Sequence, residues 1–316
     1  MKPVLVTGGA GFIGSHLVER LLAQDKEVVV IDDLSTSSLD NLAAVQGHPG
    51  LRFIRSKVSA CAELPRLAAA SDFIFHLAAT VGVDLVVKSP IQTLRNNLEE
   101  TEILLEAASL AGTPLLLAST SEVYGKSEKA FFAETDDLLI GPPYLGRWRY
   151  ACSKLMDEFL GLAYAQERQL PVIITRFFNT VGPRQTGRYG MVLPRFITAA
   201  KQGLPLRIFG DGTQSRCFCH VQDTVEALLR LQACPQAAGE IFNIGSQEEI
   251  SILDLARLVI ATLQSQSLLE FVPYDQAYAP GFEDMVRRKP DICKLERTIG
   301  FRPQTPLARI IETAAL

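Results

Sequence analysis

The sequence predicts an α/β protein with a doubly wound parallel sheet and a smaller C-terminal lobe. Apolar runs alternate with helical patterns along the first half of the chain, which is typical of parallel βαβ units. These apolar runs are continuous, so both faces of the sheet are expected to be covered. After "LPVIITRFFN" the pattern changes and glycine and proline become frequent. This change indicates a second lobe.

The expected strands of the sheet follow one another from the N-terminus. They are "KPVLVTG", "EVVVIDD", "LRFIRS", "DFIFHLAA" and "PLLLAST", with a helix in "SHLVERLLAQ" after the first and a further strand in "GEIFNIG". We expect residues 1–178, together with about 221–250, to form a dinucleotide-binding domain. Residues 179–220 and 251–316 are expected to form the substrate lobe.

Composition limits the classes of partner. The chain has 316 residues, 47% of them hydrophobic and 21% charged, with a net charge of −4. This small charge gives no reason to expect nucleic acid or an anionic membrane as a partner. No apolar run approaches a membrane span, and a strand that begins by Pro3 leaves no room for a signal peptide, so the expected compartment is the cytoplasm. The six cysteines are expected to be reduced thiols, mostly buried, and no metal site is expected.

The first strand runs into a glycine-rich loop, "TGGAGFIG". Gly8, Gly11 and Gly14 have the spacing of a dinucleotide-binding loop, and the loop opens a helix, as a Rossmann-type fold requires. Gly8 permits the tight turn, Gly11 lets the backbone approach a pyrophosphate, and Gly14 allows the helix to pack closely on the strand. The helix N-terminus then offers free N–H groups to the anion.

An acidic pair ends the second expected strand. Asp32 lies 18 residues after Gly14, where a carboxylate can accept hydrogen bonds from a ribose 2′-hydroxyl and repels a 2′-phosphate. The expected cofactor is therefore NAD rather than NADP. Asp33 is the alternative ribose ligand.

Tyr150 and Lys154 share one face of an expected helix, "RYACSKLMDEFLGLAYAQ", because residues four apart are neighbours on a helix. A nearby ammonium favours the phenolate form of a tyrosine, and a nicotinamide ring would add positive charge. We therefore expect Tyr150 to act as a base that takes a hydroxyl proton while hydride leaves the same carbon.

Together, these motifs resemble the extended short-chain dehydrogenase/reductase family. The resemblance rests on "TGGAGFIG", "HLAA", "STSEVYG", "YACSK", "RFFNTVGPRQ", "FGDGTQSRCFCHVQD" and "RRKPDI", and it covers nearly the whole chain. Members are mostly nucleotide-sugar epimerases, dehydratases and decarboxylases. The chain looks most like UDP-glucuronate decarboxylases and 4-epimerases of UDP-glucuronate or UDP-glucose.

The resemblance implies a role for each matching position. Thr120 would bond the reacting hydroxyl, Ser121 and Glu122 would lie beside C5 and C6 of the sugar, Tyr150 would be the base, and Lys154 would also hold the nicotinamide ribose. The implied cofactor contacts are Gly8, Gly11, Phe12, Ile13, Gly14, Asp32, Asp33, Leu77, Ala79 and Lys154. The implied substrate contacts are Asn179, and Arg216 and Arg288 as clamps of the diphosphate. Relatives also suggest a homodimer formed through two helices.

Three residues depart from the family pattern, at two places in the chain. The acid that usually contacts adenine is replaced by Ser56 and Lys57, which leaves the adenine contacts open. A usual glycine is replaced by Glu100, which we expect on the exposed side of its helix.

Three reactions begin alike, with oxidation at C4 of the sugar. Dehydratases carry an acid where this chain has Ser121, a much weaker acid, so dehydration is disfavoured. A 4-keto uronate loses CO₂ when its C5–C6 bond aligns with the carbonyl, and it undergoes 4-epimerisation when the carboxylate is held in the ring plane. An arginine fork suits a carboxylate, and Arg188 on a glycine-flanked loop is the candidate. The sequence therefore favours a UDP-sugar 4-epimerase, with UDP-glucuronate decarboxylase as the alternative and a non-catalytic NAD-binding sensor as a third hypothesis.

Overall fold

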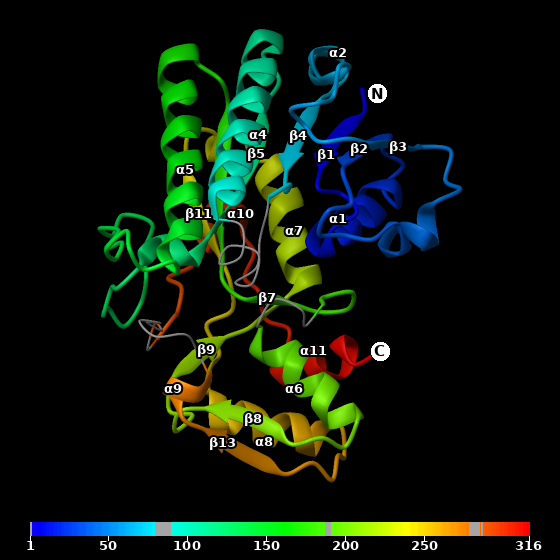
Figure 1. Cartoon of the computed structure of the whole chain (residues 1–316). Coiled ribbons are helices and arrows are strands. Elements are labelled where there is room, and N and C mark those ends of the chain that lie inside the picture. Colours follow the sequence, from blue (N-terminus) through cyan, green and yellow to red (C-terminus); the bar gives the residue numbers. More distant parts are fainter. Residues whose placement is uncertain (1, 80–89, 187–190, 278–284, 286) are drawn as a thin grey trace.

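A computed structural model describes residues 2–79, 90–186, 191–277, 285 and 287–316 of the chain (Figure 1). Its strands are β1 (Val4–Thr7), β2 (Val28–Asp32), β3 (Leu51–Arg55), β4 (Phe73–His76), β5 (Leu115–Thr120), β6 (Val172–Phe177), β7 (Thr180–Val181), β8 (Leu206–Phe209), β9 (Ser215–Cys217), β10 (Cys219–His220), β11 (Ile241–Ile244), β12 (Glu249–Ser251) and β13 (Leu269–Val272).

The α-helices are α1 (Phe12–Leu22), α2 (Leu64–Ala70), α4 (Pro90–Ala111), α5 (Trp148–Arg168), α6 (Val192–Lys201), α7 (Val221–Gln232), α8 (Ile252–Thr262), α9 (Tyr274–Ala277), α10 (Cys293–Ile299) and α11 (Leu307–Ala314). Short 3₁₀ helices are η1 (Leu39–Val45), η2 (Ser121–Tyr124) and η4 (Pro235–Ala237). In the described part of the chain, no helix combines the length and the apolar character needed to cross a membrane.

Seven parallel strands form one sheet in the order β11-β6-β5-β4-β1-β2-β3. The chain fills one half through β1, β2 and β3, and then returns to β4 beside β1 to fill the other half. This reversal makes the carboxyl ends of β1 and β4 a topological switch point, where open α/β sheets bind their ligands. The predicted doubly wound fold is confirmed.

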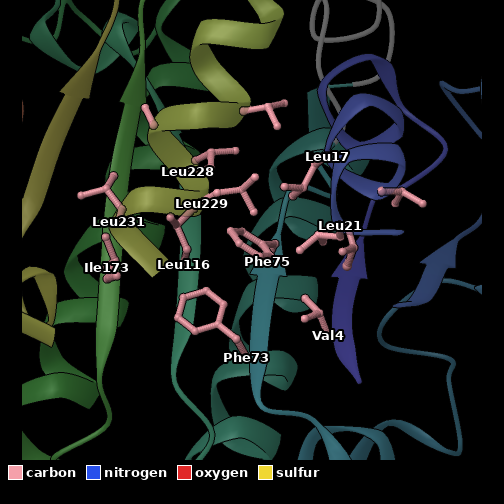
Figure 2. Close-up of a cluster of buried hydrophobic side chains, with 14 of the residues drawn as sticks. Val4, Leu17, Leu21, Phe73, Phe75, Leu116, Ile173, Leu228, Leu229 and Leu231 are labelled. Carbon is pink, nitrogen blue, oxygen red and sulfur yellow. The ribbon is translucent and has the colours of Figure 1, made fainter. Parts of the chain in front are cut away.

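Helices cover both faces of the sheet. Successive strand residues point to opposite faces, so the apolar side chains on each face need a covering layer. Val4, Phe73, Phe75 and Leu116 face α1 and α7 in one buried cluster, which Figure 2 shows with Leu17, Leu21, Leu228, Leu229 and Leu231. The residues between them, Leu5, Ile74, Leu115 and Leu117, pack with Leu104 and Leu105 of α4 on the opposite face. Each fully buried Leu or Phe contributes roughly 1.5–3 kcal/mol through removal of apolar surface from water.

The C-terminal lobe has its own core, which lies beyond the carboxyl ends of the strands (Figure 1). Residues of α6, α8, α11 and β8 meet there, with Phe196, Ile208, Leu255 and Ile310 almost fully buried. Because β11 joins the large sheet and α7 packs against α1, the chain crosses between the two cores more than once. We therefore propose the non-contiguous division into 1–178 with about 221–250 and 179–220 with 251–316.

Cysteines depart from one expectation. All six are free thiols, but Cys61, Cys217 and Cys219 are buried while Cys152 and Cys293 are exposed. Only three of the six cysteines are buried, so the expectation that most would be buried was wrong.

Candidate active site

A cavity of about 1160 Å³ opens at the carboxyl edge of the sheet and continues into the C-terminal lobe. Its wall begins at the glycine loop after β1, passes the ends of β2 and β5, and ends at lobe residues such as Arg207 and Arg216. Of the residues singled out from the sequence, those that line the cavity are Gly8, Gly11, Phe12, Ile13, Gly14, Asp32, Asp33, Leu77, Ala79, Thr120, Ser121, Glu122, Tyr150, Lys154, Asn179, Arg216 and Arg288. Arg188 lies outside the described residues.

Close approach of backbones requires the glycines of the loop. A Cβ on Gly14 would lie 2.2 Å from the carbonyl oxygen of Gly8, and a Cβ on Gly8 would lie 2.6 Å from the backbone nitrogen of Ala78. Gly8 also has a φ of +71°, which side chains disfavour. A Cβ on Gly9 would meet Val30 at 2.6 Å, a constraint that the spacing alone did not single out. The loop therefore exposes the N-terminus of α1 to the cavity, where an anion is favoured.

Asp32 ties the glycine loop to the segment after β2. Its carboxylate accepts hydrogen bonds from the backbone N–H groups of Ala10 and Leu34, both at 2.9 Å, and from the Ser37 hydroxyl at 2.8 Å. A carboxylate has about four acceptor positions, so about one is left for a ribose hydroxyl. Asp33 lines the same wall and accepts a bond from the Ser35 N–H group at 2.9 Å. This donor and acceptor pattern fits the adenosine half of a dinucleotide.

The reacting groups lie where β5 ends and α5 begins. Thr120 is the last residue of β5, and its hydroxyl accepts a hydrogen bond from the Glu122 N–H group at 3.2 Å. The Ser121 hydroxyl is buried and has no hydrogen-bond partner among the described residues. A buried polar group of this kind that faces a cavity is suited to bind a ligand. Tyr150 lines the same cavity from α5.

Lys154 forms an ion pair that the sequence analysis did not anticipate. Its ammonium lies 2.7 Å from the carboxylate of Asp157, and both side chains are buried. Burial raises the pKa of Tyr150, and the negative charges of Glu122 and Asp157 raise it further. In the chain without ligands, the expected lowering of the Tyr150 pKa by Lys154 is therefore not found.

Glu122 is held between two arginines. Its carboxylate lies 2.5 Å from the Arg288 guanidinium and 3.2 Å from that of Arg147. Burial alone would raise the pKa of Glu122, but Arg288, Arg147 and Arg216 outweigh burial and lower it, so the group is an anion. The cluster therefore places two guanidiniums and one carboxylate beside Thr120 and Tyr150.

This placement changes the role implied for Arg288. A guanidinium that binds Glu122 and also approaches the Asn179 side chain at 3.5 Å belongs to the end of the cavity near Tyr150. Arg216 lies farther into the lobe and donates to the Ser215 carbonyl at 2.7 Å. Arg195 and Arg207 line the cavity on the lobe side as well, so several guanidiniums lie at this end of the cavity.

Arg147 was missed from the sequence because it belongs to none of the recognised motifs. It immediately precedes α5, and its guanidinium lies 5.5 Å from the centre of the Trp148 ring. Trp148 is buried and packs against Gly141, where a Cβ would collide with the indole. Trp148 is not among the residues that line the cavity, so it braces the loop before Tyr150.

His76 is a structural residue. Its ring is buried between the hydroxyls of Thr7 at 2.7 Å and Thr101 at 3.2 Å. Burial, followed by the charge of Lys154, lowers its pKa to about 3, so it is neutral. Within the described residues no cluster of three or more His, Cys, Asp or Glu side chains could hold a metal ion.

Comparison with known proteins agrees with this geometry. The model of the NAD dependent epimerase/dehydratase family matches residues 4–245, and NAD is the cofactor. A UDP-N-acetyl-alpha-D-glucosaminuronate decarboxylase from Bacillus cytotoxicus is 40% identical over 303 residues, which are 96% of this chain and 93% of the relative. UDP-glucuronic acid decarboxylase 6 from Arabidopsis thaliana is 36% identical. The match spans 96% of this chain and 85% of the relative.

Solved structures with the same fold include epimerases. A UDP-N-acetylglucosamine 4-epimerase from Methanobrevibacter ruminantium superposes with a TM-score of 0.90 at 28% identity, over 99% of this chain and 97% of the other. A UDP-glucuronic acid 4-epimerase from Bacillus cereus gives a TM-score of 0.87 at 30% identity, over 99% of this chain and 98% of the other.

The ion pair of Lys154 leads to a test of the base. Replacing Asp157 by Asn removes one of the negative charges that raise the pKa of Tyr150, and it frees the Lys154 ammonium to favour the phenolate. The acid limb of the pH profile of kcat/KM should therefore move to lower pH. The matched control is the exposed Asp137→Asn, which should leave the limb in place. An acid limb that stays fixed or moves to higher pH in Asp157→Asn would show that this pair does not control the base.

Proposed function

Because this chain belongs to the NAD dependent epimerase/dehydratase family, we propose that it is an NAD-dependent decarboxylase of a UDP-linked uronic acid. The choice of a uronic acid rests on the two guanidiniums of Arg147 and Arg288 that flank Glu122, and decarboxylases at 40% and 36% identity support loss of CO₂ as the reaction. A neutral hexose offers these guanidiniums only hydroxyl groups, whereas the C6 carboxylate of a uronic acid supplies the opposite charge.

The first step is oxidation at C4 of the sugar. Thr120 holds the C4 hydroxyl and Tyr150 takes its proton, while Lys154 lies one helical turn away. When bound, NAD would supply the hydride chemistry, which is removal of a hydride from C4 and its later return. The buried surroundings of Tyr150 raise its pKa, so the positive charge brought by the cofactor is needed to favour the phenolate.

The second step is loss of CO₂ from the 4-keto sugar. The electron pair of the C5–C6 bond moves into the C4 carbonyl, which gives an enolate, and C5 then takes up a proton before C4 is reduced. The balance is one uronate and one proton converted to one pentose and one CO₂. Arg147 and Arg288 orient the carboxylate before the bond breaks, and Ser121 and Glu122 lie on the same side of the cavity.

The epimerase hypothesis that the sequence favoured is not confirmed, and the alternative is better supported. Relatives at 40% and 36% identity are decarboxylases, while the epimerase structures are 28% and 30% identical. The epimerase argument also depended on Arg188, which lies outside the described residues. A 4-epimerase of UDP-glucuronate remains the second candidate because the UDP-glucuronic acid 4-epimerase from Bacillus cereus shares the fold at 30% identity.

Product analysis tests the reaction. The purified chain with NAD should be given UDP-glucuronate and, separately, its 2-acetamido counterpart, and the products followed by NMR. We expect CO₂ and a UDP-pentose from at least one of the two. A UDP-galacturonate-type product that keeps its carboxylate would establish the epimerase instead, and no turnover of either substrate would refute both reactions.

A charge substitution tests the cluster. Arg147→Gln removes the guanidinium and should lower kcat/KM for the uronate by about 100-fold, since a charge-assisted hydrogen bond contributes roughly 1.5–3 kcal/mol. Arg149→Gln, two residues away and outside the cavity lining, is the matched control and should change kcat/KM by less than about twofold. Equal effects of the two substitutions would contradict the assigned role of Arg147.

The homodimer remains a proposal, supported by large exposed apolar side chains on α4 and α5. Leu110 is 78% and Phe159 62% exposed, and Ile91 and Met156 are exposed as well. The two helices lie side by side (Figure 1), so a second copy could cover them. Sedimentation should show a dimer that Phe159→Glu converts to a monomer and that the control Phe271→Glu, on β13, leaves intact. A monomeric wild-type chain would contradict the proposal.

A further inference from the structure

The adenine end of the cavity lies beyond Asp32. The pyrophosphate is placed at the glycine loop and the ribose at Asp32, so the base must extend toward the carboxyl ends of β2 and β3. The residues that line the cavity in this region are Leu34, Ser56, Lys57, Val58 and Glu100. Leu34 and Val58 provide apolar contacts for the faces of a planar base, and the polar side chains can meet its edge.

Glu100 differs from its expected position. Rather than pointing outward from α4, its carboxylate faces the loop after β3 and lines the cavity. One carboxylate oxygen accepts hydrogen bonds from the backbone N–H groups of Val58 at 2.6 Å and Ser59 at 3.2 Å, and the other accepts one from the Ser59 hydroxyl. These bonds fix the orientation of the carboxylate before any ligand arrives.

Counting acceptor positions shows what this carboxylate can still bind. Of about four positions on a carboxylate, the loop occupies three, so about one acceptor remains on the oxygen that binds the Ser59 hydroxyl. The N–H groups of Val58 and Ser59 are already taken by Glu100, so they cannot recognise an acceptor on the base. Besides the Ser56 and Lys57 side chains, this wall offers a negatively charged acceptor, which requires a donor on the ligand.

We propose that Glu100 is a specificity-determining residue for the cofactor and accepts a hydrogen bond from the 6-amino group of adenine. That amino group is a donor on the edge of the base, and the carboxylate is held in place at the end of the cavity where the base must lie. A base with an oxygen at this position would place an acceptor against an anion. The inference concerns cofactor binding alone and does not depend on which sugar reaction the protein catalyses.

The test compares NAD with nicotinamide hypoxanthine dinucleotide, which carries an oxygen in place of the 6-amino group. Calorimetry on the full chain, freed of bound dinucleotide and without sugar nucleotide, gives the ratio of the two dissociation constants. The wild-type chain should bind NAD at least about tenfold more tightly, as expected for a hydrogen bond to a charged group. Equal affinities in the wild-type chain would overturn the proposal, whatever the variants do.

Glu100→Gln then tests the residue itself. The loop N–H groups would hold the amide oxygen, so the amide NH₂ would face the base, where it repels a 6-amino group and suits a 6-oxygen. The ratio should therefore fall to about one or reverse. Glu99→Gln, the exposed neighbour outside the cavity lining, is the matched control and should keep the wild-type ratio. A wild-type ratio in a folded Glu100→Gln variant would overturn the proposal.

Discussion

The ion pairs of Glu122 with Arg147 and Arg288 join the three parts of the chain that build the active site. Glu122 follows β5 of the sheet, Arg147 begins α5, and Arg288 comes from the C-terminal segment. The same contacts that bring the lobe to the sheet place two guanidiniums at the reacting end. We therefore propose that structure and substrate selection depend on one cluster.

In the cofactor-binding part of the cavity, hydrogen bonds from the protein also hold carboxylates in position before the ligand binds. Asp32 accepts three hydrogen bonds from the loops around the ribose position, and Glu100 accepts three from the loop after β3. Each keeps about one acceptor position for the ligand. Preorganisation of this kind lowers the cost of ordering side chains when the dinucleotide binds.

Sequence reasoning could predict the sheet and the glycine loop because both have local signals. Continuous apolar runs such as Val4–Val6 are buried on both faces, and the loop glycines are required by close backbone contacts. It could not predict Arg147 or the location of Arg288, because no spacing rule says which surface cations fold against Glu122. Lys154 was recognised through its distance from Tyr150 along the helix, whereas its contact with Asp157 depends on side-chain direction and burial. Glu100 was assigned to the wrong side of its helix for the same reason.

The most direct test of the central claim is the affinity of the NAD-loaded chain for UDP-glucuronate relative to UDP-glucose, which differ in charge at C6. Two guanidiniums around one carboxylate should bind the uronate at least about tenfold more tightly, since a charge-assisted hydrogen bond contributes roughly 1.5–3 kcal/mol. Equal affinity for the two UDP-sugars would contradict the account, because the charge beside Thr120 and Tyr150 would then have no part in selecting the substrate.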